Sequence, residues 1–148
     1  MRPTPNAGPD LDPEFAVLVR SMPFAVPLTE GELRALSALM RRKTCTAGEL
    51  VVHQGQPAEQ GAIVSSGLGH MQYATPGRDP VEFGEIRPGD IVGEGAVGTG
   101  GYHGCSVVAD TTVVVWSFEA SAMTDLLRRC PDLARKLKAL LLAQQSRN

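Results

Sequence analysis

The sequence has few cysteines, and none of them lies in a disulfide or metal-binding pattern. Cys45, Cys105 and Cys130 are widely separated in the 148 residues, and no CxxC pair is present. An odd number of isolated cysteines argues against a disulfide scaffold and a structural zinc site, and it fits a reducing compartment. We therefore expect a cytoplasmic protein without a metal.

The sequence also lacks a strong charge imbalance and a long apolar run. The net charge is −2, so no basic surface for nucleic acid or an anionic membrane is predicted. The longest apolar run near the C-terminus, ALLLA at 139–143, is far too short to span a bilayer. The N-terminus has no apolar segment of a secretory signal. These absences predict that neither DNA nor a membrane is a partner.

Motifs of common enzyme classes are missing as well. The sequence contains no GxSxG, HExxH or GxxxxGK[ST] pattern. Gly93-x-Gly95-x-x-Gly98 matches GxGxxG, but a dinucleotide site needs a helix after the motif, and the pattern predicts strands on both sides of it. We predict no catalytic residues and no enzyme.

Helical spacing of apolar residues marks both ends of the chain. Residues 1–11, rich in proline, are predicted to be a flexible tail, and a single domain is predicted over 12–148. Asp12-Pro13 is typical of a helix start, and Thr29-x-x-Glu32 is a capping box that begins a second helix. After Glu119 helical spacing returns, and Pro131 divides that region into two helices.

Between these helices the spacing is typical of strands. Short apolar runs alternate with Gly, Pro and Asp turn signals about every ten residues after Lys43. This pattern predicts about eight antiparallel strands, closed as a β-roll or jelly-roll barrel, with a bulge near Gly84. The predicted class is mainly β with flanking helices.

Seven glycines crowd into the 21 residues from Gly89 to Ala109. Within this stretch, Glu94 has two possible roles that the sequence supports equally. It either binds ligand hydroxyls or accepts hydrogen bonds from loop amides. His103 is either a half-exposed strand residue or a contact for an anion. Cys105 shares its strand face, but two ligands do not make a metal site, so Cys105 is read as a small apolar residue.

The order of these motifs resembles the cyclic nucleotide-binding domain family from about Met22 to Leu142. The resemblance rests on Pro23-Phe24 before the capped helix, on two glycine-turned strand segments, and on the PGDxFGE-like run Arg87-Pro88-Gly89-Asp90-Ile91-Val92-Gly93-Glu94. The two strand segments are Ala47–Val51 with Gln54–Ala58, and Ile63–Gly67. The resemblance implies a small ligand, namely cyclic AMP, cyclic GMP or a cyclic dinucleotide, and no other cofactor. It implies these ligand-binding residues: Gly93, Glu94, Gly95, Ala96, His103, Gly104 and Cys105.

The chain departs from the family pattern where the phosphate should be neutralised. The family closes this segment with proline and arginine, and this chain has Tyr102-His103 there. A histidine near its reference pKa is mostly neutral at pH 7 and has fewer donors than arginine. Losing one charged hydrogen bond predicts roughly a hundredfold loss of affinity. Gly95, where the family has an apolar residue, is expected to loosen the short helix.

Two functions remain open from the sequence. The first is a regulatory sensor whose last helix, with Leu137 and Leu141, transmits ligand binding. The second is a degenerate domain that binds no nucleotide and forms a homodimer or another protein contact through the leucine face of residues 133–141. Family members that regulate transcription add a DNA-binding helix-turn-helix, and we expect none in the few residues after Leu142. The chain is thus expected to be a sensor domain alone or a fragment of a larger protein.

Overall fold

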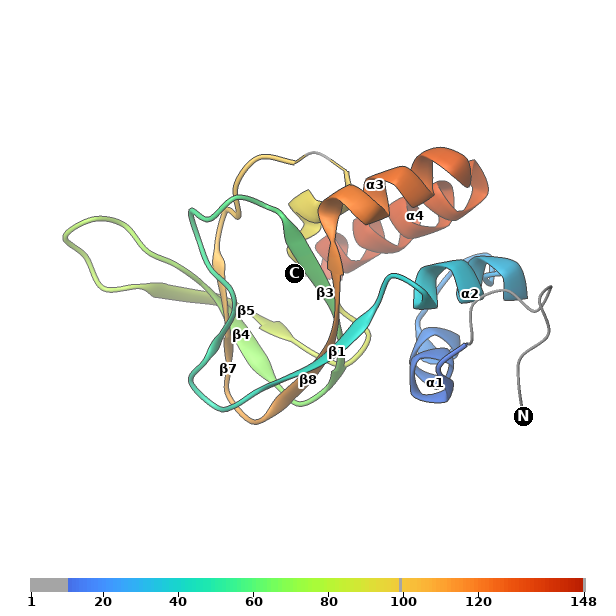
Figure 1. The fold of residues 1–148 in the computed structure, drawn as a ribbon. Helices are drawn as coiled ribbons and strands as arrows, with labels where there is room; N and C mark the ends of the chain where they lie inside the picture. The colour runs from blue at the N-terminus through green and yellow to red at the C-terminus, as the bar shows by residue number, and fades with distance from the viewer. Residues whose placement is uncertain (1–10, 99, 148) are drawn as a thin grey trace.

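The computed structural model describes residues 11–98 and 100–147, which form a β-roll with helices before and after it (Figure 1). The helices are α1 (Pro13–Ser21), α2 (Glu30–Ser37), α3 (Ala120–Arg129), α4 (Pro131–Arg147) and the short 3-10 helix η1 (Glu94–Val97). The strands are β1 (Arg41–Cys45), β2 (Leu50–Val52), β3 (Gln60–Ser66), β4 (Gly69–Tyr73), β5 (Val81–Ile86), β6 (Ile91–Val92), β7 (Ser106–Ala109) and β8 (Val113–Glu119). The predicted class is confirmed. The tail predicted at 1–11 lies outside the described residues apart from Leu11.

Both N-terminal helices begin at the predicted residues. The Asp12 carboxylate accepts hydrogen bonds from the backbone amides of Glu14 and Phe15, at 2.9 and 3.4 Å. At the start of α2, the Glu32 amide donates to Thr29 Oγ1 at 3.1 Å, and the Thr29 amide donates to Glu32 Oε1 at 2.8 Å. A cap of this kind stabilises a helix by about 1 kcal/mol. The local sequence therefore fixes where these helices enter the fold.

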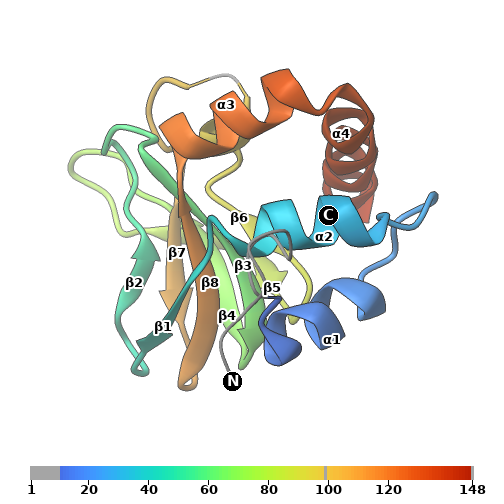
Figure 2. The same cartoon turned by 45° about the vertical axis from the view of Figure 1, so that its right-hand side comes forward.

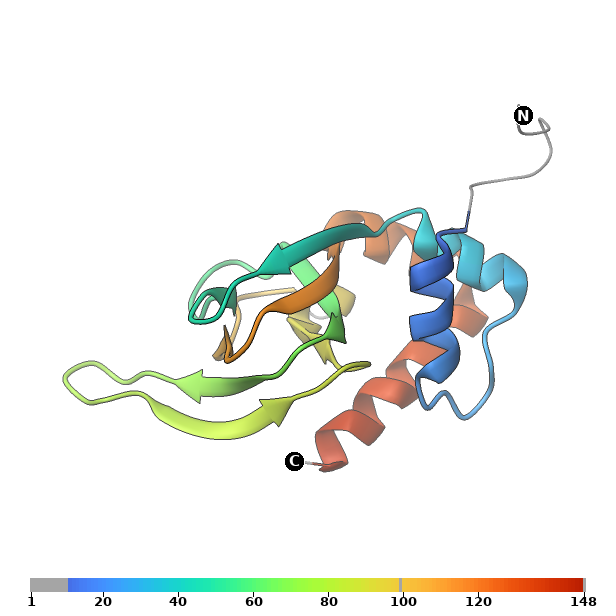
Figure 3. The ribbon, with the colours of Figure 1, turned by 90° about the horizontal axis from the view of Figure 1, so that it is seen from below.

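The strands form two four-stranded antiparallel sheets that face each other in the roll (Figure 2). The strand orders are β1-β8-β3-β6 and β2-β7-β4-β5. In the β4–β5 pair, Met71 lies opposite Gly84 and Gln72 opposite Glu82, so Phe83 has no partner. This irregularity confirms the bulge predicted near Gly84. The turn between β4 and β5 projects away from the rest of the molecule (Figures 1 and 3).

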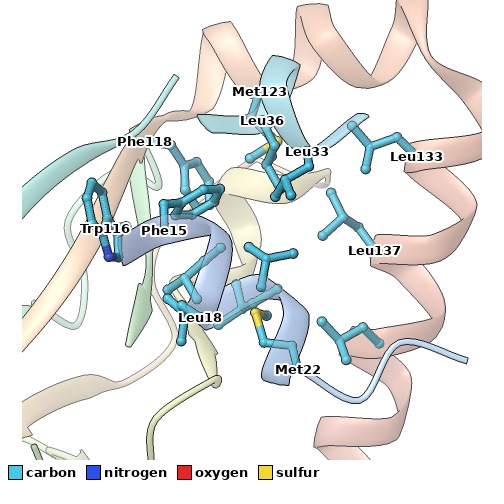
Figure 4. Close-up of a cluster of buried hydrophobic side chains, with 14 of the residues drawn as sticks. Phe15, Leu18, Met22, Leu33, Leu36, Trp116, Phe118, Met123, Leu133 and Leu137 are labelled. Atoms are coloured by element: carbon cyan, nitrogen blue, oxygen red, sulfur yellow. The ribbon is translucent and has the colours of Figure 1, made fainter. Parts of the chain in front are cut away.

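Apolar side chains form two clusters. One lies inside the roll and contains Cys45, Val64 and Val115. The other joins the helices to the outer side of the first sheet and contains Phe15, Trp116 and residues of all four α-helices (Figure 4). The helices before and after the roll therefore share one core, which holds the start of α4 in place.

The leucine face of α4 belongs to this second cluster. Leu133 and Leu137 are 0% and 2% exposed and lie with Leu33 and Leu36 of α2 (Figure 4). The alternative function uses the leucine face of residues 133–141 for a protein contact, and at these two positions the N-terminal helices already cover that face. The sequence did not reveal this, since a leucine stripe at helical spacing fits an internal core and a protein interface equally well.

A buried ion pair also joins α4 to α2. Lys136 Nζ donates to Glu32 Oε1 at 2.6 Å and to the Pro27 carbonyl at 3.0 Å, and both charged side chains are largely buried. Burial alone would raise the pKa of Glu32. The hydrogen bonds from Lys136 and from the Thr29 amide outweigh it, and the pKa is lowered. The carboxylate thus caps α2 and holds α4 at the same time.

Candidate functional site

The glycine-rich segment, called the cassette here (residues 93–105), begins with a sharp turn out of β6. Gly93 has φ +72°, and a Cβ atom there would lie 3.0 Å from the Gln60 carbonyl oxygen. Only glycine adopts this conformation readily. The same Cβ would lie 3.2 Å from His103 Cε1, so the two ends of the cassette come together at this turn.

Gly95 is required for close packing. A Cβ atom there would lie 2.9 Å from the Ala58 Cβ atom and 3.0 Å from the Gly100 carbonyl oxygen. The Gly95 carbonyl accepts a hydrogen bond from the Gly100 amide at 2.8 Å, which closes the loop after η1. The sequence predicted that Gly95 loosens the short helix. The structure adds a packing role for Gly95 that a single sequence does not reveal.

The second half of the cassette pairs with the segment before β3. The Ala58 amide donates to the Gly101 carbonyl at 2.8 Å, and the Gly55 amide donates to the His103 carbonyl at 2.9 Å. The His103 amide in turn donates to the Gln56 carbonyl at 2.9 Å. These backbone bonds fix the path of residues 101–103 and hold the His103 side chain over the turn at Gly93.

A cavity of about 860 Å³ lies between the cassette and the C-terminal helices. Six of the seven predicted site residues line it: Gly93, Glu94, Gly95, His103, Gly104 and Cys105. The seventh, Ala96, is 1% exposed and belongs to the second apolar cluster, the one with Phe15 and Trp116. Its side chain therefore points away from the cavity. The other wall consists of α3 and α4 residues, among them Leu127, Lys138 and Leu141. Leu127 and Lys138 were not predicted as site residues, because helical periodicity does not say which residues will face a cavity.

The charges around the cavity are unevenly distributed. Among the described residues, the roll contributes Glu85, Asp90 and Glu94 and no lysine or arginine, whereas the helices contribute Arg128 and Lys138. Glu94 is exposed, and no hydrogen bond joins its side chain to the described part of the chain. The carboxylates of the cavity therefore come from the roll, and its cationic side chains come from α3 and α4.

Burial lowers the pKa of His103, and the nearby Glu94 carboxylate opposes this only partly. The imidazole is therefore mostly neutral at pH 7 in the free domain. Burial and Glu94 together raise the pKa of the Cys105 thiol. Cys105 is accordingly a neutral wall residue. The described residues contain no group of three or more His, Cys, Asp or Glu side chains that could hold a metal ion.

Taken together, the roll, the glycine turn, the short helix after it and the facing helices define a β-roll domain with a cavity between its cassette and its C-terminal helices. A family model described as "Cyclic nucleotide-binding domain" matches residues 42–130. The chain therefore belongs to the cyclic nucleotide-binding domain family. Among the described residues, no helix has the length and apolar character needed to cross a membrane.

Known proteins with similar sequences or folds include the following. An uncharacterized NTE family protein of Mycobacterium tuberculosis is 28% identical over 131 residues, which cover 87% of this chain but only 22% of that protein. A cyclic nucleotide-binding domain from Methylobacillus flagellatus superimposes with a TM-score of 0.75 at 20% identity, covering 90% of this chain and 75% of that chain. The catabolite activator protein of Thermus thermophilus has a TM-score of 0.68 at 26% identity, covering 81% and 56%.

Proposed function

We propose that this domain is a non-enzymatic regulatory sensor that binds a cyclic nucleotide, or a related small anionic ligand, in the cavity between the cassette and α4. The observation that carries the proposal is the composition of the cavity wall. Cassette residues Gly93 and His103 form one side of the cavity, and Leu141 of α4 forms the other. A ligand that touches both sides binds one position of α4 better than others, and it shifts the population of α4 by that difference.

The alternative, a degenerate domain that only binds protein, has less support. Its proposed interface is the leucine face of residues 133–141, and Leu133, Leu137 and Leu140 of that face are buried inside the domain. The matched region is 22% of the mycobacterial relative, so in a longer chain of that kind the sensor would act on the remaining part. We propose α4 as the element that transmits the signal.

Isothermal titration calorimetry with cyclic AMP, cyclic GMP and a cyclic dinucleotide tests the proposed function. We expect saturable heat with at least one of them, and we expect Glu94→Ala to weaken that binding by about tenfold or more, because a charged acceptor for ligand hydroxyls is lost. Glu59→Ala is the matched control, since Glu59 is exposed and lies outside the cavity lining. If none of the three ligands gives heat at millimolar concentration, the proposal is wrong.

Binding of a cyclic phosphate is expected to depend on pH through His103. The pKa of His103 is lowered in the free domain, and a phosphate beside it would raise that pKa, so binding takes up a proton between the two values. The Kd for cyclic AMP should therefore rise as pH increases, on the order of tenfold from pH 6 to pH 8.

The other charged or titratable groups around this cavity are Glu85, Asp90, Glu94, Cys105, Arg128 and Lys138, with the phenol of Tyr102 beside them. Calorimetry in two buffers of different ionisation enthalpy measures the proton uptake directly. A Kd that is constant between pH 6 and pH 8, with no proton uptake, would contradict the role of His103. His103→Gln should lose the dependence, since the amide does not titrate.

A further inference from the structure

The last turns of α4 are attached to the roll at Asp90 and Ile91, which lie three and two residues before the cassette turn at Gly93. The Gln144 side chain accepts a hydrogen bond from the Ile91 amide and donates one to the Ile91 carbonyl, both at 2.8 Å. One side-chain amide thus satisfies both backbone groups of a residue that is 1% exposed. Ile91 pairs with Ile63 of β3 in the first sheet, so Gln144 is bound to a rigid part of the roll.

Arg147 makes a second attachment beside the first. Its guanidinium donates to both carboxylate oxygens of Asp90, at 2.9 and 2.6 Å. Asp90 is 4% exposed, and its carboxylate also accepts from the Arg87 amide at 2.9 Å. A forked arginine–carboxylate contact is strong and directional, and a buried carboxylate that loses its cation is costly. Asp90 raises the pKa of Arg147, which keeps this cation charged.

Little else holds this end of the helix. Leu140 is the last buried residue of α4, and Leu141 is half-buried at the cavity. Beyond them, the described side chains of α4 are exposed except for Gln144. Figure 3 shows α4 running from the other helices to the side of the roll, where it ends. The start of α4 is fixed by its leucines, and its end is fixed by Gln144 and Arg147.

These contacts also lie at the edge of the cavity. Asp90, Ile91 and Gln144 all belong to its lining, together with Leu141 and Leu142 of the same helix. Gly93 follows Ile91 by two residues, so the attachment point and the cassette turn are parts of one short segment. Any movement of the end of α4 away from Asp90 and Ile91 therefore widens the cavity.

We infer that Gln144 and Arg147 form a latch, which holds the end of α4 against Asp90 and Ile91 and so restricts access to the cavity. With the latch closed, α4 stays against the roll in the free domain and forms one wall of the cavity. With the latch open, the last turns of the helix leave the roll while its leucines keep the first turns in place. The latch sets how often the cavity opens, whatever ligand the cavity takes.

Cys105 provides a probe of this opening, because it is half-buried and lines the cavity, whereas Cys45 is 1% exposed inside the roll. The experiment measures the rate at which N-ethylmaleimide modifies each cysteine in the folded chain, using peptide mass spectrometry. We expect Gln144→Ala and Arg147→Ala each to speed modification of Cys105 by about tenfold, since each removes contacts that must break for opening. Modification of Cys45 should not change.

Two comparisons keep the result decisive. Ser146→Ala should leave the Cys105 rate unchanged, because Ser146 is exposed, lies outside the cavity lining, and its hydroxyl donates only to the Leu142 carbonyl within α4. Gln144→Ala removes two hydrogen bonds without stranding a buried charge, so it tests the latch even where Arg147→Ala unfolds the domain. An unchanged Cys105 rate in Gln144→Ala would overturn the inference. So would a Cys105 rate that rises only in parallel with that of Cys45, because the contacts would then stabilise the whole domain rather than close the cavity.

Discussion

Replacing His103 with arginine is expected to tighten binding of cyclic AMP by about a hundredfold. His103 lies over the turn at Gly93, and the roll side of the cavity has no lysine or arginine among the described residues. The family resemblance places an arginine at this position. A guanidinium there adds a permanent charge and a forked pair of donors for the phosphate, and a charged hydrogen bond contributes about 1.5–3 kcal/mol.

Calorimetry of wild type and His103→Arg measures this gain, with two further variants as controls. His103→Gln keeps a donor of similar size but adds no charge, so its Kd should stay near that of wild type at pH 8. His103→Lys adds a charge without the fork, and it should fall between wild type and arginine. Equal affinities for the arginine and glutamine variants would show that the phosphate does not lie near residue 103. The added arginine should also abolish the pH dependence, because it does not titrate in this range.

Much of the fold was predictable because its signals are local. Asp12-Pro13, the Thr29–Glu32 box and Pro131 act through bonds within a few residues, and the structure has helix starts at each of them. The turn signals between short apolar runs likewise depend on nearby backbone geometry. These features are encoded where they occur, so one sequence suffices to read them.

The contacts that join distant segments were not predictable in the same way. The sequence places Gly93, Glu94 and His103 in one segment, but nothing local shows that Ala96 turns into the core or that Gly95 packs on Ala58. Gln144 lies 53 residues from Ile91 and looks like any polar residue near a helix end. Such residues acquire their roles only when the helices dock, and docking depends on the whole core.

That core gives the second large prediction, which concerns Phe15. We expect Phe15→Ala to lower the free energy of unfolding by about 3–5 kcal/mol, a large share of the 5–15 kcal/mol typical of a domain. The ring is 0% exposed and meets Trp116 edge-on at a centroid distance of 5.5 Å (Figure 4). Its removal leaves a cavity between α1 and β8 and removes an aromatic pair. Urea unfolding followed by the fluorescence of Trp116, the one tryptophan of the chain, measures the loss.

Val17→Ala is the matched control, because Val17 lies on the same helix and is 68% exposed. It should change the free energy of unfolding by less than about 0.5 kcal/mol. A loss below about 1 kcal/mol for Phe15→Ala would mean that α1 is not part of the cooperative core. That result would also affect the proposed latch, because Phe15 belongs to the same cluster as Leu133 and Leu137 of α4. The start of α4 would no longer be a fixed pivot, and the movement of its end could not be confined to the latch at Asp90 and Ile91.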